Sequence, residues 1–232
     1  MALALALTGL FVVTAPAGAA GRAVTLPGAG GVTLGGQFYE ATGRPAPAVV
    51  LVHMRSRTRA DWDDIAQQLE GAGITVLAID LRGHGASGGS AASQAEMVPD
   101  LRAAVQWLST RPAVRADAVG VVGASLGANL ALLAAADQPS IRAVAAVSPS
   151  LDYRGLRVGP EVMKKLAGRG VWLAASSEDP FALRTLKELT ADTSFTRDQQ
   201  LSSIAAHGTN LLTADRDLTR ALVDWLRQRL LS

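Results

Sequence analysis

Residues 119–130 of the chain read VGVVGASLGANL. The first half is a β-rich apolar run and the second half begins an Ala- and Leu-rich segment, which predicts a strand, a tight turn and a helix. A Gly-x-Ser-x-Gly pattern at such a junction is typical of a nucleophile elbow, with Ser125 at the turn. We expect strand and helix to approach too closely for a Cβ atom at Gly123 and Gly127, and the serine backbone to be strained. The alternative is a glycine-rich loop in which the serine only caps the helix.

The composition is that of one globular domain with a sizeable core. The chain has 232 residues, 49% of them hydrophobic and 18% charged. Because it contains no cysteine, disulfides and thiol chemistry are excluded. The net charge is +2, and the arginines are scattered along the chain rather than gathered in runs. We therefore expect no nucleic-acid partner.

Residues 1–20 differ in kind from the rest of the chain. An apolar run at 3–13 is followed by small residues at 15–20, a pattern that resembles a secretory signal peptide with an A-x-A cleavage site. The run is too short for a comfortable membrane span, so no stable membrane anchor is expected. Residues 21–232 then form the single domain of an exported protein, periplasmic or extracellular. No Lys or Arg precedes the apolar run, and the alternative is a cytoplasmic protein without a signal.

Apolar runs alternate with amphipathic segments along the chain. Strands are predicted at 48–52, 74–79, 119–122, 143–147, 171–175 and 199–204, after an antiparallel hairpin at 24–26 and 32–40. Helices are predicted at 62–69, 97–108, after Ser125, at 161–167, 181–189 and 218–226, with Asp61 as the cap of the first. This alternation indicates an α/β fold: a mostly parallel, doubly wound sheet of about eight strands with helices on both faces.

Ligands of such sheets bind at the carboxyl ends of the strands. His53, Ser125, Asp179 and His207 all fall just after predicted strands. The irregular connection at 148–159 and the short helix after it are too small for a substantial lid. We therefore expect an open, shallow site at this edge of the sheet, suited to small or medium substrates.

Four motifs stand in a fixed order over residues 45–230. They are LVHM at 51–54 with Asp61-Trp62, DLRGHGAS at 80–87, GASLG at 123–127, and Glu178-Asp179-Pro180 with the late His207-Gly208. In this order and at these strand ends, the chain resembles the α/β-hydrolase family, and within it the small dienelactone-hydrolase-like or carboxylesterase-like members. The resemblance implies the α/β-hydrolase fold with a minimal lid or none, and the activity of a serine hydrolase.

The resemblance also implies a catalytic triad, because the family order along the chain is nucleophile, acid, histidine. That order gives Ser125, Asp179 and His207, the histidine being the general base and the acid orienting its imidazole. Asp152 is the alternative acid, since some members place the acid after the preceding strand. Asp179 also precedes Pro180 as a helix cap would, and we expect it to serve one of these two roles well, but not both.

The oxyanion hole implied by the family uses two backbone N–H groups, here those of Met54 and Leu126. Position 54 departs from a common His-Gly pattern, and the methionine side chain is expected near the substrate, lining an acyl pocket. His53 is interpreted either as a substrate contact or as a support for this loop. Arg55 is the candidate contact for an anionic substrate group, and the alternative is a solvated loop.

Three functions remain open at this point. The residues favour a serine hydrolase that cleaves a small-molecule carboxylic ester through an acyl-serine intermediate. Thioester or peptide hydrolysis, or acyl transfer, would use the same triad. An exported binding or scaffold protein that kept the fold without the activity is the alternative of another class. The histidines lack paired metal-ligand spacing and no Gly-x-Gly-x-x-Gly follows a strand, so neither a metal nor another cofactor is expected.

Overall fold

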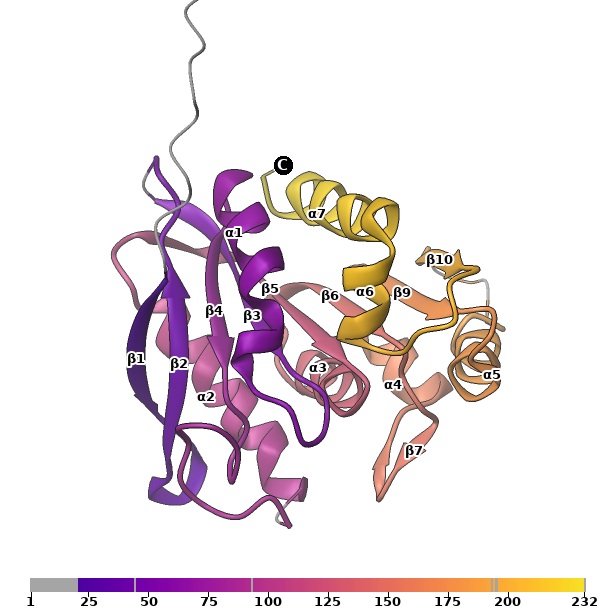
Figure 1. The fold of residues 1–232 in the computed structure, drawn as a ribbon, viewed down its shortest axis with the longest axis horizontal. Helices are drawn as coiled ribbons and strands as arrows, with labels where there is room; N and C mark the ends of the chain where they lie inside the picture. The colour runs from indigo at the N-terminus through magenta and orange to yellow at the C-terminus, as the bar shows by residue number, and fades with distance from the viewer. Residues whose placement is uncertain (1–20, 44, 93, 193, 195, 232) are drawn as a thin grey trace, which may run out of the picture.

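An eight-stranded sheet forms the centre of the part of the chain that the computed structural model describes, residues 21–43, 45–92, 94–192, 194 and 196–231. The predicted signal peptide lies outside these residues. The strand order is β1-β2-β4-β3-β5-β6-β9-β10 (Figure 1). The strands are β1 (Arg22–Pro27), β2 (Thr33–Tyr39), β3 (Ala46–Val52), β4 (Thr75–Ile79), β5 (Val114–Ala124), β6 (Ile141–Val147), β9 (Gly170–Ser176) and β10 (Asp198–Ser202).

The sheet is parallel from β4 to β10, and β1 and β2 form the antiparallel hairpin predicted at its edge. β3 lies near the middle and is buried along its whole length, as a strand covered on both faces must be. Its side chains alternate between two apolar clusters: Val50 and Val52 belong to one, and Val49 and Leu51 to the other. The prediction of a mostly parallel, doubly wound sheet is confirmed.

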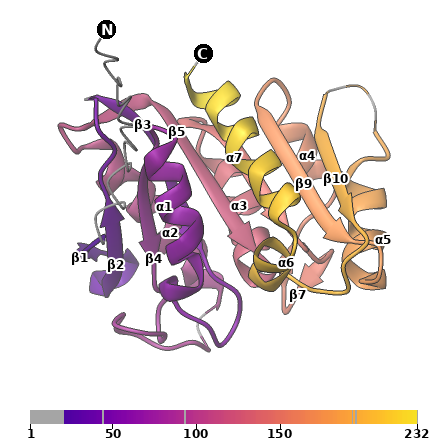
Figure 2. The ribbon, with the colours of Figure 1, turned by 45° about the horizontal axis from the view of Figure 1, so that its top comes forward.

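Helices cover both faces of the sheet (Figure 2). One apolar cluster takes its helical residues from α2 (Met97–Ser109), α3 (Leu126–Asp137), α4 (Pro160–Lys165) and α5 (Pro180–Leu189). The other takes them from α1 (Asp63–Gly71), α6 (Thr209–Ala214) and α7 (Arg216–Leu231), together with Trp62 of a short 3-10 helix, Arg59–Trp62. The two clusters therefore lie on opposite faces, separated by the sheet.

The structure departs from the sequence prediction in three connections. The segment 148–159 is not wholly irregular, because β7 (Asp152–Tyr153) and β8 (Leu156–Arg157) form a small hairpin. α6 was not predicted and is separated from α7 by Asp215, whose Oδ1 accepts a hydrogen bond from Leu218 N at 2.9 Å. Asp61 does not cap α1, which begins at Asp63. Its carboxylate Oδ2 instead accepts hydrogen bonds from Arg57 Nε at 2.8 Å and Thr209 Oγ1 at 3.1 Å.

A buried ion pair fixes the loop after β4. Asp100 of α2 accepts two hydrogen bonds from Arg82, from Nε at 2.5 Å and from a terminal nitrogen at 2.7 Å, and both residues are buried. The same carboxylate accepts a hydrogen bond from Ala29 N at 2.8 Å, in the turn between β1 and β2. One carboxylate therefore ties together a helix, a loop at the carboxyl edge and the edge hairpin.

Removing this carboxylate is expected to be costly. We expect Asp100→Ala to lower the free energy of unfolding by about 3–5 kcal/mol, because Arg82 would remain buried without its main partner. The matched control is Asp217→Ala, which breaks an exposed ion pair with Arg220 and should leave stability nearly unchanged. Urea denaturation measures both variants, and equal losses would show that the buried pair has no special role.

Candidate active site

Ser125 lies at the junction of β5 and α3 in a backbone conformation that non-glycine residues rarely adopt, with φ 52° and ψ −114°. The junction leaves no room for side chains on the flanking glycines. A Cβ at Gly123 would overlap the backbone carbonyl of Gly127, and a Cβ at Gly127 would overlap the carbonyl oxygen of Val52 at the end of β3. The predicted crowding and the predicted strain of the elbow are both confirmed.

Asp179 and His207 follow β9 and β10, which run side by side and end at the same edge of the sheet (Figure 2). Asp179 Oδ2 lies 2.5 Å from His207 Nδ1. Because a carboxylate oxygen can only accept, Nδ1 carries the proton and Nε2 is the free ring nitrogen. Asp179 Oδ1 accepts a hydrogen bond from Ala182 N at 3.0 Å and caps α5. The expectation that this residue could not serve both partners well was wrong, since each partner has its own oxygen.

Asp152, the alternative acid, is occupied elsewhere. Its two oxygens accept hydrogen bonds from Gly155 N at 2.6 Å and Arg157 Nε at 2.8 Å, which close the turn between β7 and β8. These contacts lower the pKa of the carboxyl below its usual value, the hydrogen bond from Arg157 contributing most. The structure therefore places Asp152 in a hairpin turn, and of the two acids it is Asp179 that meets the histidine.

Gly208 brings the histidine loop to the elbow. A Cβ at Gly208 would overlap the thioether of Met54 and lie 3.6 Å from the Cβ of Ala124. The residue after His207 therefore lies beside the residue before Ser125 and beside the loop that follows β3. Gly208 N donates a hydrogen bond to Ser148 Oγ at 3.0 Å, which ties the same segment to the end of β6. Four strand ends thus contribute to one cluster.

His53 supports the loop after β3 from inside the protein. Its ring is fully buried, Nδ1 lies 2.6 Å from Met54 O, and Nε2 accepts a hydrogen bond from Leu81 N at 3.0 Å. These partners require the neutral tautomer with the proton on Nδ1. Burial lowers the pKa of His53 to about 4, with the carbonyl of Met54 opposing this shift. Of the two interpretations of His53, support of the loop is confirmed and contact with substrate is corrected, because neither ring nitrogen is available to a ligand.

The Met54 side chain also lies elsewhere than expected. It is 8% exposed and packs in the apolar cluster with Ala124 and Leu211, against Gly208, instead of lining an acyl pocket. Its backbone remains at the end of β3, next to the first turn of α3. Leu126 is the first residue of that helix, where N–H groups have no acceptor within the helix. Both predicted N–H donors therefore stand at the elbow.

Of the three arginines in the loop after β3, two are engaged. Arg57 Nε donates to Asp61 at 2.8 Å, and Arg59 forms an ion pair with the buried Asp80 and donates to it from its backbone N at 2.8 Å. Arg55 is exposed and has no ion-pair or hydrogen-bond partner among the described residues. It is therefore the one cation of this loop that the described structure leaves available to a ligand.

Two supporting residues were missed by the sequence analysis. Asn129, fully buried one turn after Ser125, donates to the carbonyl oxygens of Ser150 and Leu156, each at 2.7 Å, and accepts from Ser150 N at 3.0 Å. Ser148 has a φ of 52° and accepts from Gly208. An asparagine inside an otherwise apolar helix was the available signal for the first, and a serine directly after a buried strand was the signal for the second.

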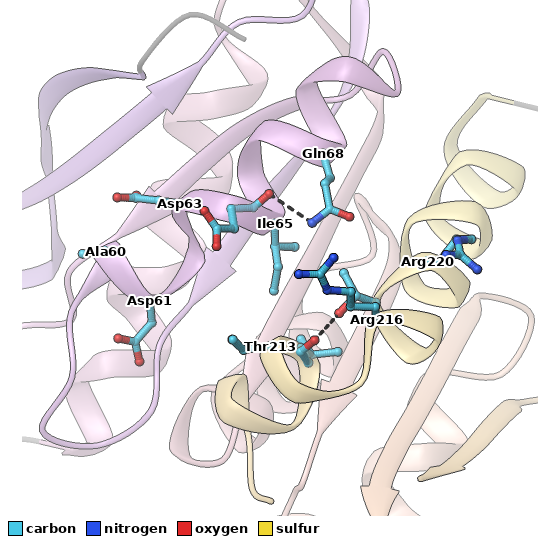
Figure 3. A pocket seen from close by; sticks show the side chains of 11 residues that line it. Ala60, Asp61, Asp63, Ile65, Gln68, Thr213, Arg216 and Arg220 are labelled. Atoms are coloured by element: carbon cyan, nitrogen blue, oxygen red, sulfur yellow. Dashed lines mark hydrogen bonds between the residues drawn. The ribbon is translucent and has the colours of Figure 1, made fainter. Parts of the chain in front are cut away.

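A cavity of about 730 Å³ lies between α1 and the helices α6 and α7 (Figure 3). Aspartates of the α1 side, Asp61 and Asp63, face Arg216 and Arg220 of α7 across it. None of the predicted catalytic or oxyanion-hole residues lines this cavity. It is a mixed-charge space, and Asp61, which lines it, also accepts a hydrogen bond from Thr209, two residues after His207.

Two further features were sought in the described part of the chain. No three of its His, Asp or Glu side chains are grouped so that they could hold a metal ion. None of its helices combines the length and the apolar character needed to cross a membrane.

The sheet order, the elbow and the strand-end cluster define an α/β hydrolase. Residues 43–211, well over half of the chain, match the family described as "Serine aminopeptidase, S33", and the chain belongs to this family of α/β hydrolases.

Curated relatives cover this chain only in part. A protein of Mycobacterium tuberculosis (strain ATCC 25618 / H37Rv), described only as uncharacterized, is 35% identical over 121 residues, which are 52% of this chain and 43% of that protein. A polyketide transferase of a Penicillium species is 30% identical over 164 residues, 68% of this chain and 55% of the relative. A thiohydrolase of Arthrinium phaeospermum is 31% identical over 123 residues, which are 52% of this chain and 40% of that protein. The chain thus spans about half the length of the curated relatives it matches.

Solved structures resemble nearly the whole described fold. An esterase of Pyrococcus furiosus superposes with a TM-score of 0.77 at 18% identity, covering 90% of this chain and 93% of its own. A dienelactone hydrolase of Anabaena variabilis has a TM-score of 0.76 at 20% identity, and the superposition covers 90% of this chain and 98% of that one. At such low identities these likenesses show the shared fold and nothing of the substrate.

The buried His53 makes stability depend on pH. An unfolded histidine takes up a proton near pH 6.5, whereas the folded pKa is about 4. Between these values the unfolded state binds more protons, so stability falls as pH falls and levels off below pH 4. From pH 7 to pH 5 we expect this residue to account for about 2 kcal/mol of lost stability. Over the same pH interval, the free energy of unfolding of His53→Gln, measured by urea denaturation, should fall by about 2 kcal/mol less than that of the wild type. Stabilities of variant and wild type that fall in parallel with pH would contradict the prediction.

Proposed function

We propose that the protein is a serine hydrolase that cleaves carboxylic esters through an acyl-serine intermediate. The observation that carries the proposal is the 2.5 Å contact between His207 and Asp179 in a loop that packs beside the strained elbow of Ser125. A weak nucleophile needs a base beside it and an acid that orients the base, and the contact between Asp179 and His207 supports this assignment of acid and base. Membership of a hydrolase family supports the same chemistry.

In the proposed mechanism, Ser125 Oγ attacks the carbonyl carbon of the ester while His207 Nε2 takes its proton. The tetrahedral intermediate collapses, and the same nitrogen returns the proton to the departing alkoxide. A water molecule, deprotonated by His207, then attacks the acyl-serine. The second tetrahedral intermediate collapses with release of the carboxylic acid, and His207 returns the proton to the departing Ser125 Oγ. Asp179 keeps the proton of His207 on Nδ1 and stabilises the imidazolium that forms in each half of the reaction.

The negative charge of each tetrahedral intermediate is proposed to bind to the N–H groups of Met54 and Leu126. The N–H of Leu126 belongs to the first turn of a twelve-residue helix, where the helix dipole favours an anion. The loop of Met54 is held by the buried His53, whose Nδ1 bonds to the carbonyl oxygen of residue 54. A donor that is fixed before the reaction stabilises charge without reorganisation.

Arg55 suggests the chemical class of the substrate. It is exposed, directly follows a proposed oxyanion donor, and lacks the carboxylate partners that engage the other two arginines of its loop. The connection from β6 to β9 contributes only a two-strand hairpin and the six-residue helix α4 near the site. We infer an open site for a small or medium ester that carries a carboxylate or phosphate group.

Thioester hydrolysis or acyl transfer is the second candidate. Relatives of this chain include proteins named as a thiohydrolase and as polyketide transferases. The proposed triad would form the same acyl-serine from a thioester, and the acceptor of the acyl group would decide between hydrolysis and transfer.

Export by way of residues 1–20 is also part of the proposal, with the periplasm or the medium as the site of action.

The nucleophile is tested by labelling with a fluorophosphonate probe and by turnover of a short p-nitrophenyl ester. Ser125→Ala should abolish labelling, and Ser125→Ala, His207→Ala and Asp179→Ala should each lower kcat by at least about 10⁴-fold. The control is Ser140→Ala, an exposed serine at the amino end of β6, which should retain both activities. A folded wild-type protein that is not labelled would overturn the proposal and favour a non-catalytic binding protein.

The role of Arg55 is tested with two esters of the same acyl length, mono-p-nitrophenyl adipate and p-nitrophenyl hexanoate, which end in a carboxylate and in a methyl group, respectively. Arg55→Gln should lower kcat/KM for the anionic ester by about 10- to 100-fold, the value of one lost charge-assisted hydrogen bond. The neutral ester should be unaffected. Arg220→Gln, which makes the same change in net charge on α7, should leave both esters unchanged. A loss of equal size for both esters would contradict a role in recognising the anion.

A further inference from the structure

Met54 makes a contact that the oxyanion role of its backbone does not require. Its thioether fills the space beside Gly208, so that a Cβ on that glycine would overlap both Sδ and Cγ. Gly208 has a φ of 59°, in the left-handed region that favours glycine, and directly follows His207. The side chain of the loop after β3 therefore lies directly against the backbone of the loop that carries the proposed base.

The same glycine is enclosed on two other sides. Its Cβ position lies 3.6 Å from the Cβ of Ala124, the residue before the proposed nucleophile, and its N–H donates to Ser148 Oγ at 3.0 Å. Met54 is thus one wall of a slot whose other walls belong to the elbow and to the end of β6. The backbone that directly follows His207 is therefore in contact with segments on both sides of Ser125.

Polar contacts hold the two loops together at their ends. Thr209 Oγ1 donates to Asp61 at 3.1 Å, and Asp61 accepts a second hydrogen bond from Arg57 Nε at 2.8 Å. The backbone N of Arg57 in turn donates to Met54 O at 3.3 Å. Of these three contacts, only the first joins the loop after β3 to the His207 segment, and it does so at Thr209, beyond Gly208. At Gly208 itself, apolar packing by Met54 opposes any movement of the loop toward β3.

We propose that the Met54 side chain is a positioning residue, which sets His207 against Ser125 by packing on Gly208. The inference rests on the proposed function, since it assigns a part in the same reaction. It also explains why position 54 differs from the common pattern. The Met54 side chain, on the loop after β3, occupies the space that a glycine leaves open on the histidine loop. An unbranched thioether suits this place, because it fills irregular gaps.

If His207 is held less firmly against Ser125, the chemical step should slow with little effect on substrate binding. Met54→Ala should lower kcat for a p-nitrophenyl ester by about 10- to 100-fold, with KM within about threefold, because displacements near 1 Å cost this much in well-oriented reactions. Met54→Leu, which conserves volume, should return kcat to within about threefold of wild type. Met163→Ala is the matched control, since it truncates a buried methionine on α4 and should leave kcat nearly unchanged.

A double-mutant cycle with Gly208→Ala tests the contact itself. The added Cβ overlaps Met54, so Gly208→Ala alone should be slow, and the combined loss in Met54→Ala/Gly208→Ala should be smaller than the product of the single losses. Independent losses, or a Met54→Ala enzyme as fast as wild type, would overturn the inference while leaving the triad intact. Failure of the proposed function looks different, because the wild-type protein would then neither react with the fluorophosphonate nor turn over an ester.

Discussion

The crossing of α3 over the end of β3 is the constraint on which the site depends. At Gly127 the first turn of the helix lies so close to the carbonyl oxygen of Val52 that only a glycine fits, and at Gly123 the strand meets the helix with the same lack of space. This contact forces Ser125 into strained backbone and brings the start of α3 next to the residue that follows β3. The proposed nucleophile and both proposed N–H donors are thereby placed by these two close approaches.

The loops around this crossing are held by buried polar groups, each of which satisfies backbone atoms of another segment. His53 joins the loop after β3 to the start of the loop after β4. Asp100 joins the loop after β4 to the edge hairpin, and Asn129 joins α3 to the connection after β6. Apolar packing sets the sheet and its helices, but it is poorly directional. Hydrogen bonds with paired donors and acceptors give the loops a single arrangement, because an unpaired buried group is costly.

The sequence was most informative where local pattern decides the structure. Continuous apolar runs such as 48–52 predicted strands buried on both faces, and the glycines around Ser125 indicated a close approach of a strand and a helix. Asp179 and His207 were predictable only in combination with a family order, since either could be a surface residue. The roles of Asp61, His53 and the Met54 side chain were not predictable in this way. Their partners lie 148, 28 and 154 positions away in the chain, and no local pattern records such contacts.

The departure at position 54 shows how two unusual residues can explain one another. Considered alone, a methionine side chain on a proposed oxyanion donor suggests an obstruction of the site, and a glycine with positive φ after His207 suggests a weakly held loop. In the fold they are neighbours, and the side chain of the first occupies the space that the second leaves open. The Met54 side chain therefore occupies the space beside Gly208, although position 54 departs from the common pattern and position 208 does not. A residue that differs from the family pattern near a proposed catalytic group is thus better interpreted from the residues that it packs against than from the pattern alone. Packing density is a property of the contact and not of either residue.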